Sequence, residues 1–396
     1  MATFSVSFLG CKVSHTDAQE IRERLLAEGH VEQPGPGDAA VVNTCCVTHE
    51  AIRKSRRAAT RAARTHARVY VTGCGANLTG DAFAGLPENI VVVRRRNEET
   101  AEHVAGDLGA LACVQADHRL DRVRAFVKVQ DGCSFSCSFC VIPLVRGASR
   151  SRAASAVLGE IERRVDQGHR EVVLTGINLG CYRDRPAGYD LPRLVREAGS
   201  VRGLARLRLS SVEVNHLTED LLEALRETPT VSRHLHVPLQ SGDDSVLRSM
   251  RRRYTASVYL RRVAAAADFN LTTDVIVGFP GEDEPAFQRT LEVVDEAGIT
   301  KVHVFPYSPR PGTLTAADDP VVPEVKKERS ARLRARSHEA CLRRWQAKVG
   351  SEDVVLVDRP GRGYGDDYSP WLLDAPVGEI VRARARGFTD EGILAV

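Results

Sequence analysis

The sequence predicts an α/β protein in three parts: an N-terminal open parallel α/β domain, a central partial barrel of six βα units, and a small C-terminal antiparallel β module. Short β-branched runs alternate with helical segments through the first hundred residues. Six further strand and helix pairs follow, and short strand-like pieces separated by Gly and Asp begin near residue 351. At 396 residues and 43% hydrophobic composition, the chain can bury more than one core.

Three N-terminal strands are predicted to finish at cysteines. The strands cover 4–11, 39–45 and 68–74, and the helices between them cover 16–29 and 50–66. In an open parallel sheet, ligands bind at the carboxyl ends of the strands, so Cys11, Cys45 and Cys74 are expected to converge on one edge. The alternative is three unrelated buried thiols, because a free cysteine packs like a small hydrophobic residue.

The central strands are predicted from apolar runs that recur with helical patterns between them. They cover 126–130, 171–176, 206–211, 234–240, 272–279 and 301–307. Eight such units would close a full barrel, so six predict a partial one, with its chemistry on loops at the carboxyl ends of the strands. Ser151 is expected to cap the helix that runs to Gln167, and Thr218 is expected to cap a later helix. A helix over 323–348 connects to the antiparallel module, for which an oligonucleotide-binding barrel is one candidate form.

Three cysteines, Cys133, Cys137 and Cys140, directly follow the first barrel strand in the stretch DGCSFSCSFC. Structural zinc prefers four ligands in a closed tetrahedral site, and here the fourth thiol would have to be recruited from a distance, as Cys113 or Cys181. A [4Fe-4S] cluster held by three cysteines instead leaves one iron open to bind a substrate. Spacing alone leaves both alternatives open.

The segment CSFSCSFC resembles the C-x3-C-x2-C loop of the radical S-adenosylmethionine superfamily. This resemblance implies that Cys133, Cys137 and Cys140 hold a [4Fe-4S] cluster whose open iron binds S-adenosylmethionine. One electron from such a cluster cleaves the sulfonium and releases a 5′-deoxyadenosyl radical, which takes hydrogen from an unactivated carbon. On a predicted six-unit barrel, the motif is a specific signal.

The segments LGCKV, VNTCCVT and VTGCGAN resemble the second cluster site of the methylthiotransferases within that superfamily. The resemblance also covers 146–152, 238–255, 272–282 and 305–313. It implies that Cys11, Cys45 and Cys74 hold a second [4Fe-4S] cluster, whose open iron carries sulfide or persulfide. Cys46 is an alternative ligand to Cys45. No matching role exists for Cys113, Cys181 and Cys341.

Finer features of the resemblance concern the substrate. SPRPGT, with Arg310, resembles the tRNA-modifying branches, and Cys11-Lys12-Val13 with Phe305-Pro306 resembles the one that thiomethylates N6-threonylcarbamoyladenosine at position 37. The alternatives are the branches that modify N6-isopentenyladenosine-37 or a ribosomal-protein aspartate. Ser14 stands where Asn is usual, and Gly75-Ala76-Asn77 replaces aromatic-Ala-Gln. Both departures adjoin cluster ligands, so they bear on the geometry of the second cluster.

Cofactor contacts are expected at the carboxyl ends of the barrel strands. LQSG and VGFPGE place Gln240, Gly242 and Gly278 there, where glycine allows close backbone approach and polar groups can meet a nucleoside. Asp274 is a further candidate, with a paired structural acid as the alternative. The family resemblance implies S-adenosylmethionine, two [4Fe-4S] clusters and a low-potential electron donor such as a flavodoxin or ferredoxin.

The net charge of only +3 creates no global basic field, but seven Lys or Arg and no acid lie between Arg53 and Arg68. The candidate RNA contacts are Arg53, Arg56, Arg57, Arg61 and Arg310. Their partner would be a single-stranded tRNA anticodon loop whose base can unstack. The alternative is a solvated helix surface. A rival class is a non-catalytic zinc and RNA-binding protein.

The predicted domains cover 1–112 with the second cluster, 122–348 with the radical S-adenosylmethionine barrel and connector helix, and 349–396 as a TRAM-like RNA-binding module. The first ten residues lack the basic and long apolar regions of a secretory signal, and no segment reaches the roughly 20 apolar residues that span a bilayer. Ten cysteines in a chain of this length suit a reducing compartment. A cytoplasmic protein with no membrane partner is expected.

Overall fold

The computed structural model describes residues 1–80, 82–95, 97–109 and 123–396. The chain forms two compact units. The first contains Met1–Arg119, Asp131–Ser149 and Ser308–Ala317, and the second contains Leu120–Gln130, Arg150–Tyr307 and Asp318–Val396. The loop with the three clustered cysteines therefore belongs to the same unit as the N-terminal cysteines. The three predicted domain ranges stay a prediction, because this division follows compactness alone.

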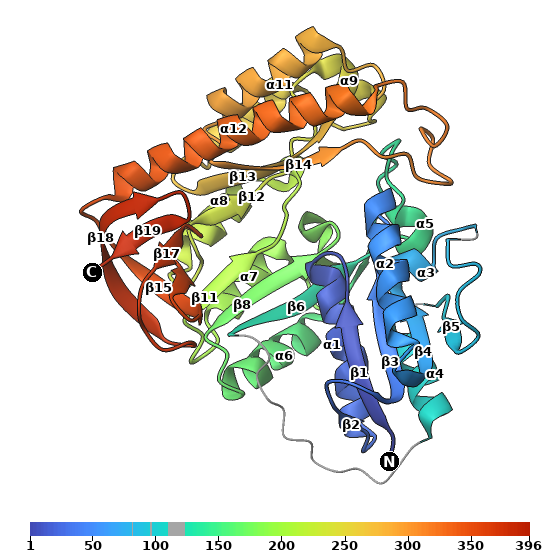
Figure 1. The fold of residues 1–396 in the computed structure, drawn as a ribbon. Helices are drawn as coiled ribbons and strands as arrows, with labels where there is room; N and C mark the ends of the chain where they lie inside the picture. The colour runs from blue at the N-terminus through green and yellow to red at the C-terminus, as the bar shows by residue number, and fades with distance from the viewer. Residues whose placement is uncertain (81, 96, 110–122) are drawn as a thin grey trace. The chain divides into compact units, whose positions relative to one another are not determined.

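The first unit is built on a five-stranded, all-parallel sheet in the order β2-β1-β3-β4-β5 (Figure 1). Its strands are β1 (Thr3–Phe8), β2 (Val31–Glu32), β3 (Gly37–Thr44), β4 (His66–Thr72) and β5 (Ile90–Val92). Its helices are α1 (Lys12–Ala27), α2 (His49–Ala62), α3 (Gly73–Ala76), α4 (Asn97–Leu108) and α5 (Ile142–Arg146). The three predicted strands and two predicted helices are confirmed. The short edge strands and α4 carry too weak a pattern to be predicted.

Alternation along β3 explains how helices cover both faces of this sheet. Val41 packs with Ile21 and Leu25 of α1, in a cluster that also contains residues of α4. The next residue, Val42, points to the other face and packs against α2. Thr48 caps α2, since its side chain accepts a hydrogen bond from the backbone N–H of Ala51 at 3.0 Å. Helices on both faces leave the carboxyl edge of the sheet for the cysteines.

The second unit contains the six predicted barrel strands, in the predicted order. They are β6 (Arg124–Asp131), β8 (Glu171–Gly176), β11 (Arg206–Leu209), β12 (His234–His236), β13 (Asn270–Val277) and β14 (Lys301–Pro306). Parallel pairing joins β6, β8 and β11, and separately β12, β13 and β14. Parallel bridges link Leu207 to Val231 and Ser211 to His236, so the six strands follow one another around a partial barrel. The predicted architecture is confirmed.

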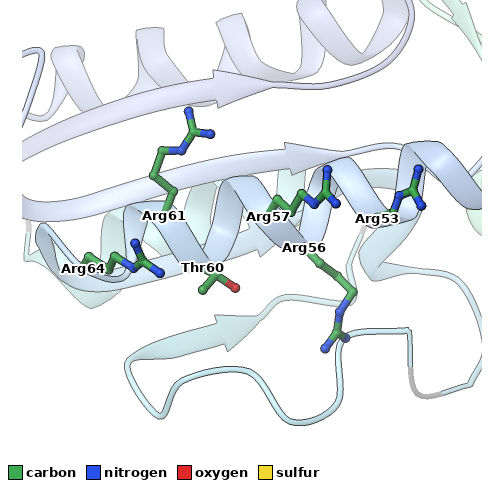
Figure 2. Close-up of a pocket in the computed structure, with 6 residues that line it drawn as sticks. All are labelled: Arg53, Arg56, Arg57, Thr60, Arg61 and Arg64. Atoms are coloured by element: carbon green, nitrogen blue, oxygen red, sulfur yellow. The ribbon is translucent and has the colours of Figure 1, made fainter.

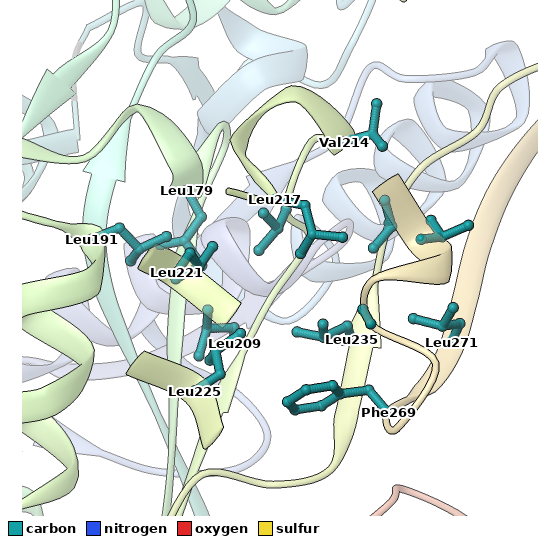
Figure 3. Close-up of a cluster of buried hydrophobic side chains, with 14 of the residues drawn as sticks. Leu179, Leu191, Leu209, Val214, Leu217, Leu221, Leu225, Leu235, Phe269 and Leu271 are labelled. Atoms are coloured by element: carbon teal, nitrogen blue, oxygen red, sulfur yellow. The ribbon is translucent and has the colours of Figure 1, made fainter. Parts of the chain in front are cut away.

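The barrel core lies between the strands and the surrounding helices. These helices are α6 (Ala154–Asp166), α7 (Leu191–Gly199), α8 (Glu219–Glu227), α9 (Asp244–Ser249), α10 (Ala256–Ala264) and α11 (Glu284–Glu296). Figure 3 shows Leu209, Leu235 and Leu271, from three successive strands, packed in this cluster. Since side chains alternate along a strand, Arg208, His236 and other polar neighbours occupy the opposite face. The interior face of the barrel is therefore polar.

Two predicted helix caps have different outcomes. Thr218 caps α8, because its side chain accepts a hydrogen bond from Leu221 N at 3.3 Å. The prediction for Ser151 is wrong. Ser151 lies in the short strand β7 (Arg150–Ser151), and its hydroxyl accepts from Arg183 N at 2.9 Å, whereas α6 begins after Ala153. The Ser151 hydroxyl therefore holds the start of β9 (Arg183–Asp184) and does not cap α6.

The C-terminal module is a small closed barrel in the order β15-β16-β17-β19-β18. Its strands are β15 (Glu352–Arg359), β16 (Arg362–Tyr364), β17 (Pro370–Leu372), β18 (Ile380–Thr389) and β19 (Gly392–Ala395). All pairs are antiparallel except β17 with β19, which confirms the predicted module with one parallel exception. The connector helix is confirmed as α12 (Pro323–Lys348), and its Trp345 packs with Trp371 inside the module.

A buried ion cluster joins the barrel strands to this module. Glu171, at the start of β8, is fully buried and pairs with Arg124 at 2.9 Å, Arg208 at 2.9 Å and Arg206 at 3.3 Å. Arg206 and Arg208 also donate to backbone carbonyls of Val354 at 2.6 Å and Gly365 at 2.9 Å. One carboxylate thus holds three guanidinium groups, and all three contact the C-terminal barrel, since Arg124 also pairs with Asp358 of β15 at 3.7 Å.

Candidate functional site at two cysteine trios

The structure places the three N-terminal cysteines at the carboxyl ends of adjacent strands, as predicted. Cys11 immediately precedes α1, Cys45 follows β3, and Cys74 lies in α3 just after β4. Cys45 and Cys74 are buried, whereas Cys11 is exposed. Gly10 allows the first loop to approach the second: its φ is +124°, and a Cβ added there would lie 3.3 Å from the Cys45 sulfur.

The buried thiols differ in their electrostatics. A hydrogen bond from Cys46 lowers the pKa of Cys74 to about 7 against the effect of burial, with further help from Arg146. Burial raises the pKa of Cys45 to about 11. The same contact with Cys74, together with burial, raises the pKa of Cys46. Cys46 is fully buried beside Cys74, Leu78 and other apolar side chains, so it serves Cys74 as a hydrogen-bond donor.

The two departures from the family pattern have local explanations. Ser14 lies 3.8 Å from the Cys11 sulfur, within contact distance for a hydroxyl and a thiol. A Cβ on Gly75 would lie 2.6 Å from the hydroxyl of Thr44, so an aromatic residue would not fit against this threonine. Asn77 donates to the carbonyl of Val145 at 3.2 Å, which ties α3 to α5. These substitutions keep the segment around Cys74 packed.

The loop of the three clustered cysteines is closed by backbone hydrogen bonds. Cys133 N donates to Gly147 O at 3.0 Å, and Cys140 N donates to Cys137 O at 3.2 Å. All three thiols are partly exposed. The backbone N–H of Phe135 donates to the Cys133 sulfur at 3.4 Å, a contact of the kind that tunes thiolates in iron–sulfur sites. Three accessible thiols on one ordered loop fit a cluster.

A single bound metal ion, such as structural zinc, is the alternative to a cluster at each trio. Within the ranges that the structure describes, no three His, Cys, Asp or Glu side chains are grouped closely enough to hold one metal ion. In a [4Fe-4S] cluster, each thiolate binds a different iron, so the trios are better compared with a cluster than with a single ion. Cys113, considered as a distant fourth ligand, lies outside the described residues.

Of the predicted cofactor contacts at the barrel edge, one has an unusual backbone conformation and three have partners or close neighbours within the protein. Gln240 has a φ of +67°, an uncommon backbone conformation for a residue other than glycine, and such strain is concentrated at functional sites. Asp274 lies 3.1 Å from Nε2 of His236, which supports the paired acid given as its alternative. Gly242 and Gly278 have packing reasons: an added Cβ would lie 2.6 Å from the Thr290 backbone and 2.4 Å from Lys326.

A basic stripe lies on α2, defined here by Arg53, Arg57, Arg61 and Arg64. With Arg56 and Thr60 it lines a hollow of about 440 Å³ (Figure 2). Arg53 pairs with Glu50. Arg57, Arg61 and Arg64 are exposed, and none makes an ion pair with any residue in the described part of the chain. Sequence reasoning missed Arg64 and Thr60, although Arg64 continues the three- and four-residue spacing of the stripe.

Two of the predicted RNA contacts have structural partners instead. Arg56 points to the neighbouring loop in Figure 2 and donates to the carbonyls of Ala82 at 2.6 Å and Ala84 at 2.9 Å. Arg310 is only 3% exposed and donates to the carbonyl of Cys46 at 3.4 Å. Guanidinium groups that already donate to backbone carbonyls are less available to meet phosphate, whether partly exposed as in Arg56 or buried as in Arg310. Arg310, which the sequence predicts as an RNA contact, supports the backbone beside the cysteine site, and its contact with RNA stays a prediction.

Two segments of the chain match known protein families, and the whole chain resembles known proteins. Residues 127–294 match the Radical SAM superfamily, and residues 3–93 match a family described as uncharacterized protein family UPF0004. The chain is 34% identical to "Threonylcarbamoyladenosine tRNA methylthiotransferase MtaB" of Thermotoga maritima, over 100% of this chain and 97% of that protein. It is 35% identical to the protein of the same name from Bacillus subtilis, over 97% and 94%.

A second group of relatives carries a different name. The chain is 34% identical to a "tRNA-2-methylthio-N(6)-dimethylallyladenosine synthase" of Mycobacteroides abscessus, over 98% of this chain and 83% of that protein. Among solved structures, the radical S-adenosylmethionine methyltransferase TsrM from Kitasatospora setae has a TM-score of 0.58 at 15% identity, covering 79% and 77% of the two chains, which supports the fold alone. Within the described residues, no helix is both long and apolar enough to cross a membrane.

Proposed function

The chain belongs to the radical S-adenosylmethionine methylthiotransferase family, and on that premise we propose that it converts N6-threonylcarbamoyladenosine at position 37 of tRNA to its 2-methylthio derivative. The observation that carries this proposal is similarity along the whole chain to three proteins named for that activity, at 34–35% identity. The presence of both cysteine trios on one compact unit supports it. The substrate tRNA implies a cytoplasmic protein.

The reaction needs radical chemistry because the C2–H of adenine is neither acidic nor hydridic, which leaves acid–base groups little to act on. A [4Fe-4S] cluster with S-adenosylmethionine supplies a one-electron cleavage that yields a carbon radical able to take such a hydrogen. Cys133, Cys137 and Cys140 would hold this cluster, while the N–H of Phe135 stabilises the charge on one thiolate. A flavodoxin or ferredoxin is the proposed class of electron donor.

The sulfur would be delivered at the N-terminal trio. Cys11, Cys45 and Cys74 would hold a second [4Fe-4S] cluster that carries sulfide or persulfide as the sulfur source. The lowered pKa of Cys74 suits it to bind as a thiolate, and the exposure of Cys11 leaves one side of the site open. Cys45 is favoured over Cys46 because Cys45 directly follows β3, whereas Cys46 packs within an apolar cluster.

The experiment that tests the substrate is nucleoside mass spectrometry of tRNA from cells lacking this protein. We expect the 2-methylthio form of threonylcarbamoyladenosine to be lost in these cells and to return when the gene is supplied again. Loss of the 2-methylthio form of the isopentenyl nucleoside would instead select the second candidate, which similarity to the dimethylallyladenosine synthases favours. Unchanged tRNA together with loss of the 2-methylthio group from a ribosomal-protein aspartate would reject both.

Two RNA-binding surfaces are proposed, each within one unit: the basic stripe on α2 in the first unit, and the C-terminal barrel, residues 349–396, in the second. Three unpaired cations on one exposed helix face can neutralise phosphates of a single-stranded loop. On β18, Arg382, Arg384 and Arg386 are exposed at alternate positions, with alanines pointing inward between them. These three arginines extend along one edge of the module and support its assignment to RNA.

Reversing the charge of Arg57, Arg61 and Arg64 to glutamate is expected to weaken tRNA binding by at least about tenfold near 0.1 M salt. The slope of log K against log salt should fall by about 2, since each lost contact to a single strand removes about 0.7. Filter binding or fluorescence anisotropy over a salt series measures both quantities. The matched control reverses Arg202, Arg248 and Arg261, exposed arginines of the other unit. Equal affinity and slope in the two triple variants would refute the RNA role of the stripe.

A further inference from the structure

Arg146 is a buried cation that contacts both cysteine-bearing parts of the first unit. It ends α5, six residues after Cys140, and its side chain is 7% exposed. Its Nε donates to the Cys74 sulfur at 2.9 Å, one Nη donates to Asp131 at 3.0 Å, and the other donates to Asp17 at 2.7 Å. One guanidinium thus bonds three acceptors at once.

These acceptors come from three segments, each close to a proposed cluster ligand. Asp17 lies on α1, six residues after Cys11, and Asp131 ends β6, two residues before Cys133. Cys74 is itself a proposed ligand. Arg146 therefore lies at the junction of the two trios, although its partners are 129, 72 and 15 residues away in the sequence.

We propose that Arg146 is a positioning residue that fixes Cys74 against the C-x3-C-x2-C loop and raises the reduction potential of the iron–sulfur cluster bound by the N-terminal trio. The inference rests on the proposed second cluster. The spacing of the cysteines alone does not predict this role for Arg146.

The planar geometry of arginine is necessary for this contact. A guanidinium presents five N–H donors in a fixed fork, so it can address three acceptors in different directions. A lysine ammonium keeps the charge but acts as a compact point charge on a flexible stem. Substitution by lysine therefore separates the effect of charge from the effect of the fork.

Packing around Arg146 keeps the contact in place. The neighbouring Val145 packs with Cys46 and Cys74 in one apolar cluster, and its carbonyl accepts from Asn77 at 3.2 Å. The two carboxylates hold the remaining guanidinium donors, and Asp17 is almost fully buried. Since each of the three guanidinium nitrogens has its own acceptor, the guanidinium has little freedom to turn away from Cys74.

The electronic consequence follows from charge. A reduced cluster carries one more negative charge than the oxidised cluster, so a nearby cation and an N–H donor on a ligand sulfur stabilise the reduced form. Removing the cation leaves Asp17 and Asp131 beside the site without their counter-ion, which lowers the potential further. Loss of an outer contact to a metal ligand also typically weakens metal binding by 10- to 100-fold.

The test uses the full chain with Cys133, Cys137 and Cys140 replaced by serine, so that only the N-terminal site can take up iron. Into this background are placed Arg146→Gln, Arg146→Lys and Asp17→Asn, with Arg94→Gln as the matched control. Arg94 donates to the carbonyl of Ala76 in α3, the helix that contains Cys74, but makes no hydrogen bond to a cysteine sulfur within the described residues. Iron per chain and the midpoint potential, followed by electron paramagnetic resonance, are measured after anaerobic reconstitution.

Arg146→Gln is expected to shift the potential to more negative values and to lower iron retention. Arg146→Lys should give a smaller negative shift, Asp17→Asn a positive shift because one anion is removed, and Arg94→Gln no shift. A potential unchanged in the Arg146→Lys and Asp17→Asn variants would overturn the proposal, even if Arg146→Gln failed to fold. A background protein that takes up no iron would instead reject the second cluster, and with it the proposed source of sulfur.

Discussion

Replacing Cys133, Cys137 and Cys140 with serine is expected to abolish formation of the 2-methylthio nucleoside and to halve the iron content. The reconstituted protein should fall from about eight irons per chain to about four, because one of two [4Fe-4S] clusters loses its ligands. Activity should fall to background, because this cluster is the proposed source of the electron that cleaves S-adenosylmethionine. Iron assay and nucleoside mass spectrometry of products made in vitro measure the two effects.

The matched control is Cys341→Ser, a thiol in the second unit that donates to the carbonyl of Thr300 at 2.8 Å and has no proposed cofactor role. This variant should keep about eight irons and its activity. The triple variant should also retain its tRNA affinity, because the basic stripe on α2 is untouched. Full iron content in the triple variant would contradict the assignment, as would product formation without the three thiols.

The N-terminal site is predictable because each of its three cysteines follows a predicted strand. Cys11, Cys45 and Cys74 are far apart in the sequence, but each follows a β-branched run, and parallel strands bring their carboxyl ends to one edge. The same logic ordered the six barrel strands. Hydrophobic periodicity reports which face of an element is buried, so it is strong for long repeated units and weak for β2 and β5, which have two and three residues.

Side-chain partners were not predictable from the same pattern. Arg56 and Arg57 are neighbours in one basic run, yet one binds loop carbonyls and the other is exposed. Arg310 and Arg146 are buried through contacts with residues 264 and 129 positions away. The sequence predicts Gly242 and Gly278 as ligand-approach positions, which stays a prediction, but it could not show that Thr290 and Lys326 of neighbouring helices lie close to these glycines. Such roles depend on tertiary neighbours.

Replacing Glu171 with glutamine is expected to destabilise the second unit by about 3–5 kcal/mol, because breaking a buried ion pair leaves uncompensated charge in the interior. Glu171 is the common partner of Arg124, Arg206 and Arg208. Burial opposes its ionisation, but the three arginines, with Arg208 contributing most, hold the pKa of Glu171 below its usual value. Glutamine keeps the shape of the side chain and a hydrogen-bond acceptor, so the loss of stability measures the contribution of the negative charge of Glu171.

Urea unfolding, followed by circular dichroism, measures this change in stability. The matched control is Glu292→Gln, which breaks an exposed pair with Arg289 at 3.2 Å and should cost at most about 1 kcal/mol. Limited proteolysis should release the C-terminal barrel sooner in the Glu171 variant, because Arg206 and Arg208 would no longer be held where they bind its carbonyls. Equal stability of the two variants would contradict the role of the ion cluster.

The pH dependence of unfolding tests independently whether the ionised form of Glu171 stabilises the folded protein. Since the folded-state pKa of Glu171 is lowered, its stabilising contribution is fully present above the unfolded value of about 4.3 and is lost as the pH falls through the lower folded value. The difference in unfolding free energy between the parent and Glu171→Gln should therefore be constant near neutral pH and shrink in acid. A difference that grew on acidification would mean that the carboxyl group is neutral in the folded protein, and that Arg206 and Arg208 are held mainly by the backbone carbonyls of the C-terminal barrel.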